Sequence, residues 1–187
     1  MIVRCIVTGN SGGKSVVASD GPAPRTHVYR HFPGMATSLI WGTPASPRIP
    51  FDGHNPIDRS SGFVPSVSGE TRLTFVTFPP DSVTAQPGFD GVAAGSEYAA
   101  ECPDIAAAFE PDAPGMHATQ TVDYAIVLDG EIWLELDEGR EVCLKAHDVA
   151  IQNGTRHAWR NKSMRPTKVA FVLIGARRAD QDNSELP

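Results

Sequence analysis

A stretch in the second half of the chain, GMHATQTVDYAIVLDG at residues 115–130, carries a histidine and an acid in a mostly apolar setting. If the stretch is extended throughout, His117, Thr119 and Asp123 project to one side, because side chains alternate along a β-strand. Another histidine, His157, follows the turn signal NG at residues 153–154. Two imidazoles and a carboxylate suit an open divalent-metal centre, and the same groups serve as general acid and base.

Neighbouring residues are candidates for contact with a substrate. Gln152 would offer an amide to a carbonyl or carboxylate, and Trp159 and Trp133 would offer an apolar wall. Thr119 carries only a neutral hydroxyl, which is a weak metal ligand, and is predicted to contact the substrate. Each of these residues also has an ordinary explanation in core or turn packing, and a lone histidine in a sheet is more often a hydrogen-bonded structural residue than a ligand.

The elements that must position these residues are short, because 16 prolines and 17 glycines punctuate the chain. Residues 91–109 are rich in alanine and predict two short helices that are interrupted at Pro103. Residues 42–69 predict a long surface loop or an arm over a neighbouring subunit. Strands are predicted at residues 2–8, 15–19, 36–41, 72–78, 122–128, 131–137, 141–144, 149–152, 157–160 and 168–174.

The segment from residue 115 to residue 174 resembles the cupin superfamily, which is defined by two histidine-bearing motifs. The last four fixed positions of the first motif are His, His, Glu and Gly. They fall on His117, Thr119, Asp123 and Gly130 in this chain, with the spacing that the motif requires. The glycine that opens the family motif is replaced by Pro111.

The second cupin motif is also matched at its end and altered at its beginning. Its closing Gly, His and Asn are present as Gly154, His157 and Asn161. Strict spacing puts Ala146 at the opening glycine and Gln152 at the proline. The resemblance therefore covers about a third of the chain strongly and the preceding strands weakly.

The resemblance implies an all-β fold, an antiparallel cupin-type β-barrel (jelly roll) with extra N-terminal strands and short helices before the barrel motif. The chain is expected to comprise N-terminal strands with a long loop that pack on the barrel (residues 1–85), a short helical segment that would act as a lid (86–114), the cupin core motifs (115–176) and a flexible tail (177–187). A homodimer and a divalent metal ion (Fe, Mn, Zn or Ni) held by His117, Asp123 and His157 are implied as well. Because aspartate reaches roughly 1.5 Å less far than the family's glutamate, this ligand set should bind metal more weakly or prefer a different metal.

Composition argues against two classes of partner and favours a small-molecule substrate or a protein. A net charge of -6 and a pI near 5.4 disfavour nucleic acid and anionic membranes, both of which need a basic face. The sequence has no apolar run of about 18 residues and its start lacks the features of a secretory signal, so a cytoplasmic location is expected. Three widely spaced cysteines without a CxxC pair predict reduced thiols.

The N-terminal segment TGNSGGKS at residues 8–15 partly matches a phosphate-binding P-loop. Position 8 is threonine where the P-loop needs glycine, and the residues that follow are β-branched and end at a turn signal. A β-hairpin is therefore predicted here.

Three functions remain open at this point. The leading one is a metal-dependent cupin enzyme acting on a small aromatic or carboxylated metabolite, as an oxygenase or as a decarboxylase or isomerase. The second is a metal-free isomerase or cyclase in which His157 and Asp123 form a proton-transfer pair. The third is a non-catalytic small-molecule-binding barrel. His27, His31 and His54 are expected on loops or the surface, with one of them able to reach the barrel mouth and replace the missing ligand.

Overall fold

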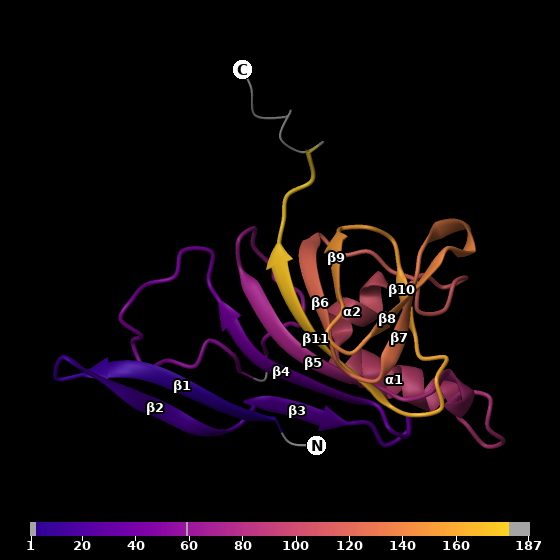
Figure 1. The fold of residues 1–187 in the computed structure, drawn as a ribbon, viewed down its shortest axis with the longest axis horizontal. Helices are drawn as coiled ribbons and strands as arrows, with labels where there is room; N and C mark the ends of the chain where they lie inside the picture. The colour runs from indigo at the N-terminus through magenta and orange to yellow at the C-terminus, as the bar shows by residue number, and fades with distance from the viewer. Residues whose placement is uncertain (1–2, 59, 180–187) are drawn as a thin grey trace.

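Two antiparallel sheets form the body of the protein (Figure 1). The computed structural model describes residues 3–58 and 60–179. The larger sheet has the strand order β3-β4-β5-β11-β6-β9, and the smaller has the order β10-β7-β8. The strands of these two sheets are β3 (Arg25–Val28), β4 (Ala36–Thr43), β5 (Thr71–Phe78), β6 (Thr121–Asp129), β7 (Glu131–Glu135), β8 (Glu141–Lys145), β9 (Val149–Asn153), β10 (Ala158–Arg160) and β11 (Thr167–Gly175).

The predicted all-β jelly roll is confirmed, although the sheets are not closed into a continuous barrel. The alternation of inward and outward side chains along the strands explains how the two sheets pack. Buried residues recur at every second position along β6 and β7, so each strand turns one face inward. These inward side chains form a core that is shared by the two sheets. Its buried members are Ala125, Val127, Ile132, Leu134, Leu144 and Val169.

The turn between β6 and β7 depends on a glycine of the first motif. Gly130 has φ 84°, a left-handed conformation that favours glycine. A Cβ atom at this position would lie 2.5 Å from the Thr167 hydroxyl oxygen. That hydroxyl donates a hydrogen bond to the Glu131 carbonyl (2.7 Å), so the turn is tied to the start of β11.

Two helices, α1 (Gly91–Glu101) and α2 (Pro103–Ala108), confirm the predicted interruption at Pro103. The Asp90 carboxylate caps α1 by accepting from the backbone N–H groups of Val92 and Ala93. Cys102, between the helices, packs with Leu39 of β4 in a second buried cluster. Two 3-10 turns complete the helical structure, η1 (Asp81–Val83) and η2 (Asp137–Gly139). In the described part of the chain, no helix is long and apolar enough to cross a membrane.

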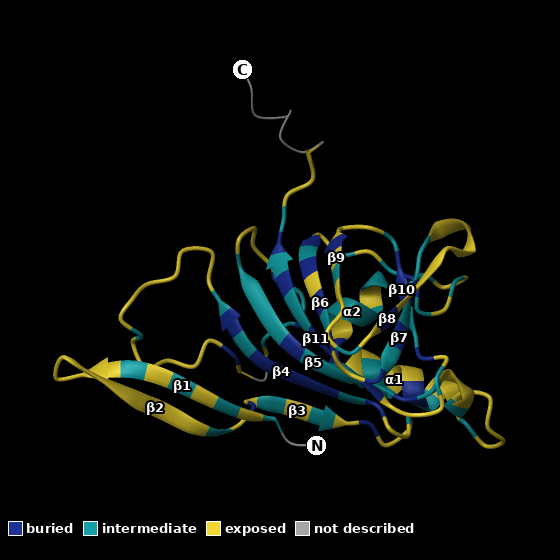
Figure 2. Ribbon diagram, in the orientation of Figure 1, coloured by how far each residue is buried: buried dark blue, intermediate teal, exposed yellow. Residues whose placement is uncertain are grey.

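The N-terminal segment forms a separate two-stranded sheet, β1 (Arg4–Ser11) and β2 (Lys14–Pro22), which extends away from the two larger sheets (Figure 1). Its two glycines of positive φ, Gly12 and Gly13, lie in the turn, which confirms the hairpin predicted in place of a P-loop. Much of its surface is exposed (Figure 2). The division of the chain into four parts and the homodimer stay predictions, and residues 180–187 of the predicted tail lie outside the described residues.

A buried asparagine joins the strands that carry the second motif to the larger sheet. Asn161 is 1% exposed, and its side-chain amide donates to the carbonyls of Phe78 (2.9 Å) and Arg165 (2.8 Å). Its side-chain oxygen accepts from the Ser163 hydroxyl (2.7 Å) and backbone N–H (3.1 Å). The motif asparagine is therefore a structural residue.

Replacing this asparagine should destabilise the fold. We expect Asn161→Ala to lower the free energy of unfolding by about 3 kcal/mol, because it leaves two buried carbonyls without a donor. Urea denaturation followed by tryptophan fluorescence measures the change. Asn153→Ala, at an exposed position of β9, is the matched control and should change stability by about 0.5 kcal/mol or less. Equal losses in the two variants would contradict the structural role.

Candidate functional site

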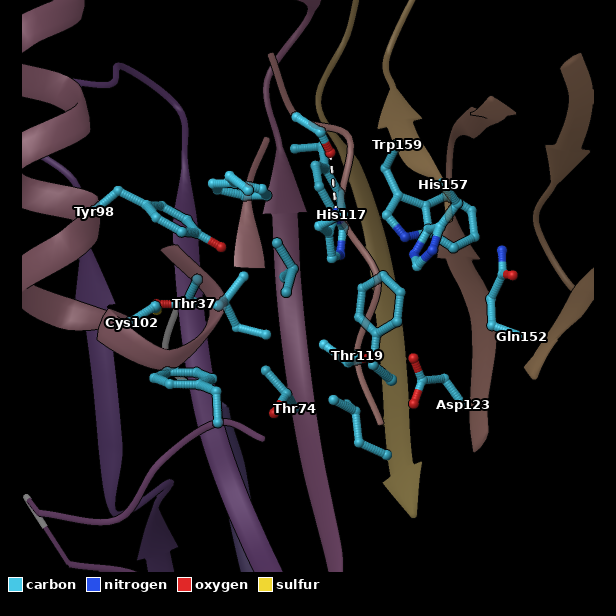
Figure 3. A pocket seen from close by; sticks show the side chains of 18 of the residues that line it. Thr37, Thr74, Tyr98, Cys102, His117, Thr119, Asp123, Gln152, His157 and Trp159 are labelled. Atoms are coloured by element: carbon cyan, nitrogen blue, oxygen red, sulfur yellow. Dashed lines mark hydrogen bonds between the residues drawn. The ribbon is translucent and has the colours of Figure 1, made fainter. Parts of the chain in front are cut away.

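The two motif histidines lie side by side. The backbone N–H of His117 donates to the His157 carbonyl, and the N–H of His157 donates to the His117 carbonyl, each at 2.9 Å. This isolated antiparallel bridge places two residues that are 40 positions apart directly opposite each other. Their ring centroids are 4.4 Å apart (Figure 3).

Both imidazoles have the same tautomer. Nδ1 of His117 donates to the Gly115 carbonyl (3.0 Å), and Nδ1 of His157 donates to the Thr155 carbonyl (2.9 Å). A carbonyl oxygen only accepts, so each Nδ1 carries a proton and each Nε2 has a free lone pair. The site therefore presents two imidazole acceptors.

Burial keeps these two histidines neutral. It lowers the pKa of His117, and it lowers the pKa of His157 to about 4, with the neighbouring His117 as a second cause. In both cases the hydrogen bond to a backbone carbonyl opposes the shift. Each ring is therefore uncharged at neutral pH and able to accept a proton or a hydrogen bond.

Asp123 and Gln152 form a second polar pair on the wall of the same cavity. They are opposite each other in the β6–β9 register, and both side chains are buried. Burial raises the pKa of Asp123 to about 6, against the opposing effect of a hydrogen bond from the Thr121 side chain. The Thr119 hydroxyl lies 2.6 Å from that of Thr121. A chain of hydroxyls thus leads from Thr119 to the carboxylate.

One cavity of about 150 Å³, between the larger sheet, the two helices and the start of β10, is lined by His117, Thr119, Asp123, Gln152 and His157. Tyr98 and Cys102 from the helical segment and Trp159 from β10 contribute to its wall (Figure 3). Burial raises the pKa of the Cys102 thiol to about 11, so it is a neutral wall group at neutral pH. The apolar part of the wall includes Phe63, Phe78, Ile105, Phe109, Phe171 and Leu173.

Several predicted candidates lie elsewhere. Trp133 does not line the cavity, because its neighbours in β7, Ile132 and Leu134, are the ones that point into the core. The three N-terminal histidines, His27, His31 and His54, do not line the cavity either. Among the described residues, the imidazoles that line it are therefore those of His117 and His157.

Carboxylates of α1 contact β3 and the residues that follow it, and Glu97 makes the largest number of these contacts. Glu97 of α1 accepts from the backbone N–H groups of Arg30 (2.9 Å) and His31 (2.8 Å) and contacts His27 Nε2 (2.9 Å). These contacts lower the pKa of Glu97 to about 2. The helices therefore cover the cavity in this structure, and their action as a lid stays a prediction.

The arginines that flank His157 in sequence are already paired. Arg156 binds the carboxylates of Glu110 (2.6 Å) and Asp137 (2.5 Å), and Arg160 binds Glu135 (2.6 Å). The described residues that line the cavity include no lysine or arginine. The cavity therefore offers no cation to an anionic ligand.

The structure does not group His117, Asp123 and His157 as the three-ligand metal centre that the resemblance implies. Among the described residues there is no group of three or more His, Cys, Asp or Glu side chains arranged to hold a metal ion. His117 and His157 form a two-imidazole pair, while the carboxylate of Asp123 lies further along the wall (Figure 3). Metal binding by all three residues stays a prediction.

Comparison with known proteins points to one superfamily, although no family model matches the chain. Phomopsin biosynthesis cluster protein D of Diaporthe leptostromiformis is 46% identical over 72 residues, which cover 38% of each protein. The cupin-domain-containing oxidoreductase virC of Hypocrea virens is 34% identical over 62 residues, 32% of each protein. The matches thus span about two fifths or less of these relatives. A Cupin_2 domain of an XRE family transcriptional regulator from Enterobacter cloacae aligns with a TM-score of 0.39 at 13% identity, over 77% of this chain and 99% of that one.

The chain contains a cupin superfamily domain. Similarity to cupin-domain proteins, the jelly-roll sheets and the bridged motif histidines agree on this assignment. Sequence reasoning missed the part of the cavity wall that precedes the motifs, notably Thr74 of β5 and Tyr98 of α1. The alternation of β5 was visible in the sequence, but it does not tell which face lies over a cavity.

The buried carboxyl and imidazole should affect stability in opposite directions between pH 4 and 6.5. Asp123, whose pKa rises from 3.8 to about 6, contributes stability that is full below pH 3.8 and is lost as pH rises through 6. His157, whose pKa falls from 6.5 to about 4, contributes stability that is full above pH 6.5 and is lost as pH falls through 4.

We therefore expect Asp123→Asn to steepen the loss of stability on acidification. Its free energy of unfolding should fall by about 2 kcal/mol more than that of the wild type between pH 7.5 and pH 4.5, because the compensating carboxyl is gone. Urea denaturation at both pH values measures the difference. Asp129→Asn, at the exposed end of β6, should follow the wild type. Parallel curves for wild type and Asp123→Asn would show that the carboxyl does not titrate in this window.

The two-imidazole pair should become a tighter metal site when a third imidazole is added. We expect Thr119→His to increase affinity for Ni²⁺ or Zn²⁺ by roughly tenfold or more, because residue 119 lines the same cavity. Titration calorimetry on protein freed of metal with a chelator measures this. Gln120→His places the same ring at the adjacent exposed position and should leave affinity unchanged. An equal gain in both variants would show that the added ring does not converge with His117 and His157.

Proposed function

We propose that this chain is a cupin enzyme that moves a proton within a small, ring-bearing organic molecule held in the cavity. The observation that carries the proposal is the pairing of two neutral imidazoles with a carboxyl group of pKa about 6 around one largely apolar cavity. A pair of groups with different proton affinities facing one bound molecule is the arrangement that acid–base catalysis needs.

Each group has a distinct part in this proposal. His157 is uncharged at neutral pH, and its free Nε2 takes a proton from the substrate. Because the pKa of His157 is low, the resulting imidazolium is a strong acid and readily returns its proton to another position of the substrate. Asp123, with a pKa close to neutral, holds or releases the second proton of the exchange. The aromatic wall reduces the contact of the bound molecule with water.

The relatives support action on small molecules. Two of them are named for the biosynthesis of phomopsin and of oryzines, and others are named as cupin-domain-containing oxidoreductases. This favours an enzyme of small-molecule biosynthesis over an inert barrel. The paired histidines, with both Nε2 atoms free, also favour a metal-dependent version of the enzyme as the second candidate, which the titration of Thr119→His examines directly.

The proposal predicts exchange of substrate hydrogen with solvent. Purified wild-type protein incubated in D₂O with a fungal metabolite extract should introduce deuterium into one or a few small molecules, detected by mass spectrometry. His157→Gln should reduce this incorporation by roughly 100-fold or more, the usual size of an acid–base contribution.

The control for this experiment is His54→Gln, which changes an imidazole whose side chain is 89% exposed and outside the cavity. It should retain full incorporation. Incorporation that persists in His157→Gln would overturn the role of His157. Bound metabolites that never gain deuterium in the wild type would favour the non-catalytic binding barrel.

A further inference from the structure

Three buried polar atoms in the cavity have no hydrogen-bond partner. They are Thr74 Oγ1, Asp123 Oδ1 and Gln152 Nε2. Their residues are 3%, 7% and 4% exposed, and all three line the same cavity. Buried polar groups in proteins are nearly always paired, because an unpaired one has lost its water without a replacement. These atoms are therefore available to pair with the polar groups of a molecule that binds in the cavity.

Two of the three atoms, one a donor and one an acceptor, belong to residues that are paired across two strands. Asp123 and Gln152 are opposite each other on β6 and β9, where cross-strand side chains begin roughly 5 Å apart. The Thr155 hydroxyl donates to Gln152 Oε1, which leaves the Nε2 amide free to donate. The Thr121 side chain binds the Asp123 carboxylate, which leaves Oδ1 free to accept. Each side chain is thus oriented by one neighbour and presents one unused atom.

The rest of the cavity limits the ligand further. Its volume of about 150 Å³ is comparable to that of a protein cavity that accommodates benzene, so one ring with small substituents fits. Its wall is mainly aromatic and aliphatic. Thr74 lies on β5, two strand spacings (roughly 10 Å) from Asp123 on β6, and offers a partner to a polar substituent on the far side of the ring.

We propose that Asp123 and Gln152 recognise a carboxamide or lactam on a single-ring ligand. The ligand N–H donates to Asp123 Oδ1 while its carbonyl accepts from Gln152 Nε2, so both unused atoms are paired by one planar group. This inference deepens the proposed function, on which it rests for the location of the substrate. The paired group anchors the ring beside His117 and His157, whose Nε2 atoms face the same cavity.

The same geometry disfavours a carboxylate ligand. A ligand carboxylate would place a second negative charge next to Asp123, and like charges at close range in a buried site repel strongly. No arginine or lysine among the described residues lines the cavity to offset that repulsion. The Asp123–Gln152 pair should therefore bind a carboxamide more tightly than a carboxylate of the same shape.

Benzamide and benzoate test this selectivity, because they differ only in the group that the pair would bind. At pH 8 we expect wild-type protein to bind benzamide at least about tenfold more tightly than benzoate, measured by ligand-observed NMR and titration calorimetry. Gln152→Leu should weaken benzamide binding by about tenfold, because it removes the donor to the carbonyl. Asp123→Asn should keep benzamide binding within about threefold and strengthen benzoate binding by about tenfold, because it removes the charge and adds a donor.

Asp129→Asn changes an exposed carboxylate on the same strand and should leave both affinities unchanged. Benzoate binding as tight as benzamide in the wild type, an unchanged preference in Asp123→Asn, or no saturable binding of benzamide would each overturn the inference. The outcome is separate from that of the deuterium experiment. Binding selectivity that follows the prediction while His157→Gln keeps full incorporation would retain this inference and reject the proposed proton transfer.

Discussion

The reciprocal backbone hydrogen bonds between His117 and His157 are the contact on which the site depends. They join a segment that precedes β6 to a segment that precedes β10, and so connect the larger sheet to the smaller one next to the cavity. Because residues opposite each other in an antiparallel bridge have adjacent side chains, this backbone contact alone brings the two imidazoles together. The Nδ1 bonds to Gly115 and Thr155 then fix the orientation of the rings. Position and tautomer thus both come from main-chain atoms.

Burial converts this arrangement into chemistry. The same apolar wall lowers the proton affinity of the imidazoles and raises that of Asp123, because in each case it disfavours the charged form. In water a histidine binds a proton far more tightly than an aspartate does, by more than two pKa units. In this cavity the order of the two is reversed, so Asp123 binds a proton more tightly than His157 does. An apolar enclosure is therefore as much a part of the site as the polar residues.

The second half of the fold was predictable from local patterns, whereas the cavity was not. Hydrophobic alternation and the turn at residues 129–130 predicted β6 and β7, and the interruption at Pro103 separated the two helices, because these signals act over a few residues. Strand β3 was not predicted, because its four residues, RTHV, are too few to show an alternating pattern. The contribution of Thr74 to the cavity depends on β11 lying between β5 and β6, a long-range pairing that no local spacing encodes.

The departures from the cupin motif are coupled through hydrogen bonds. At the position of the family's second histidine, Thr119 places its hydroxyl 2.6 Å from that of Thr121. Thr121 in turn binds Asp123, the shortened acid of the motif. The residue at the position of the family's second histidine is thus linked through Thr121 to the acid, whose Oδ1 has no hydrogen-bond partner. Thr119 and Asp123, the two departures from the family's ligand positions, therefore belong to one set of hydrogen-bonded side chains, so a change at either position affects the other.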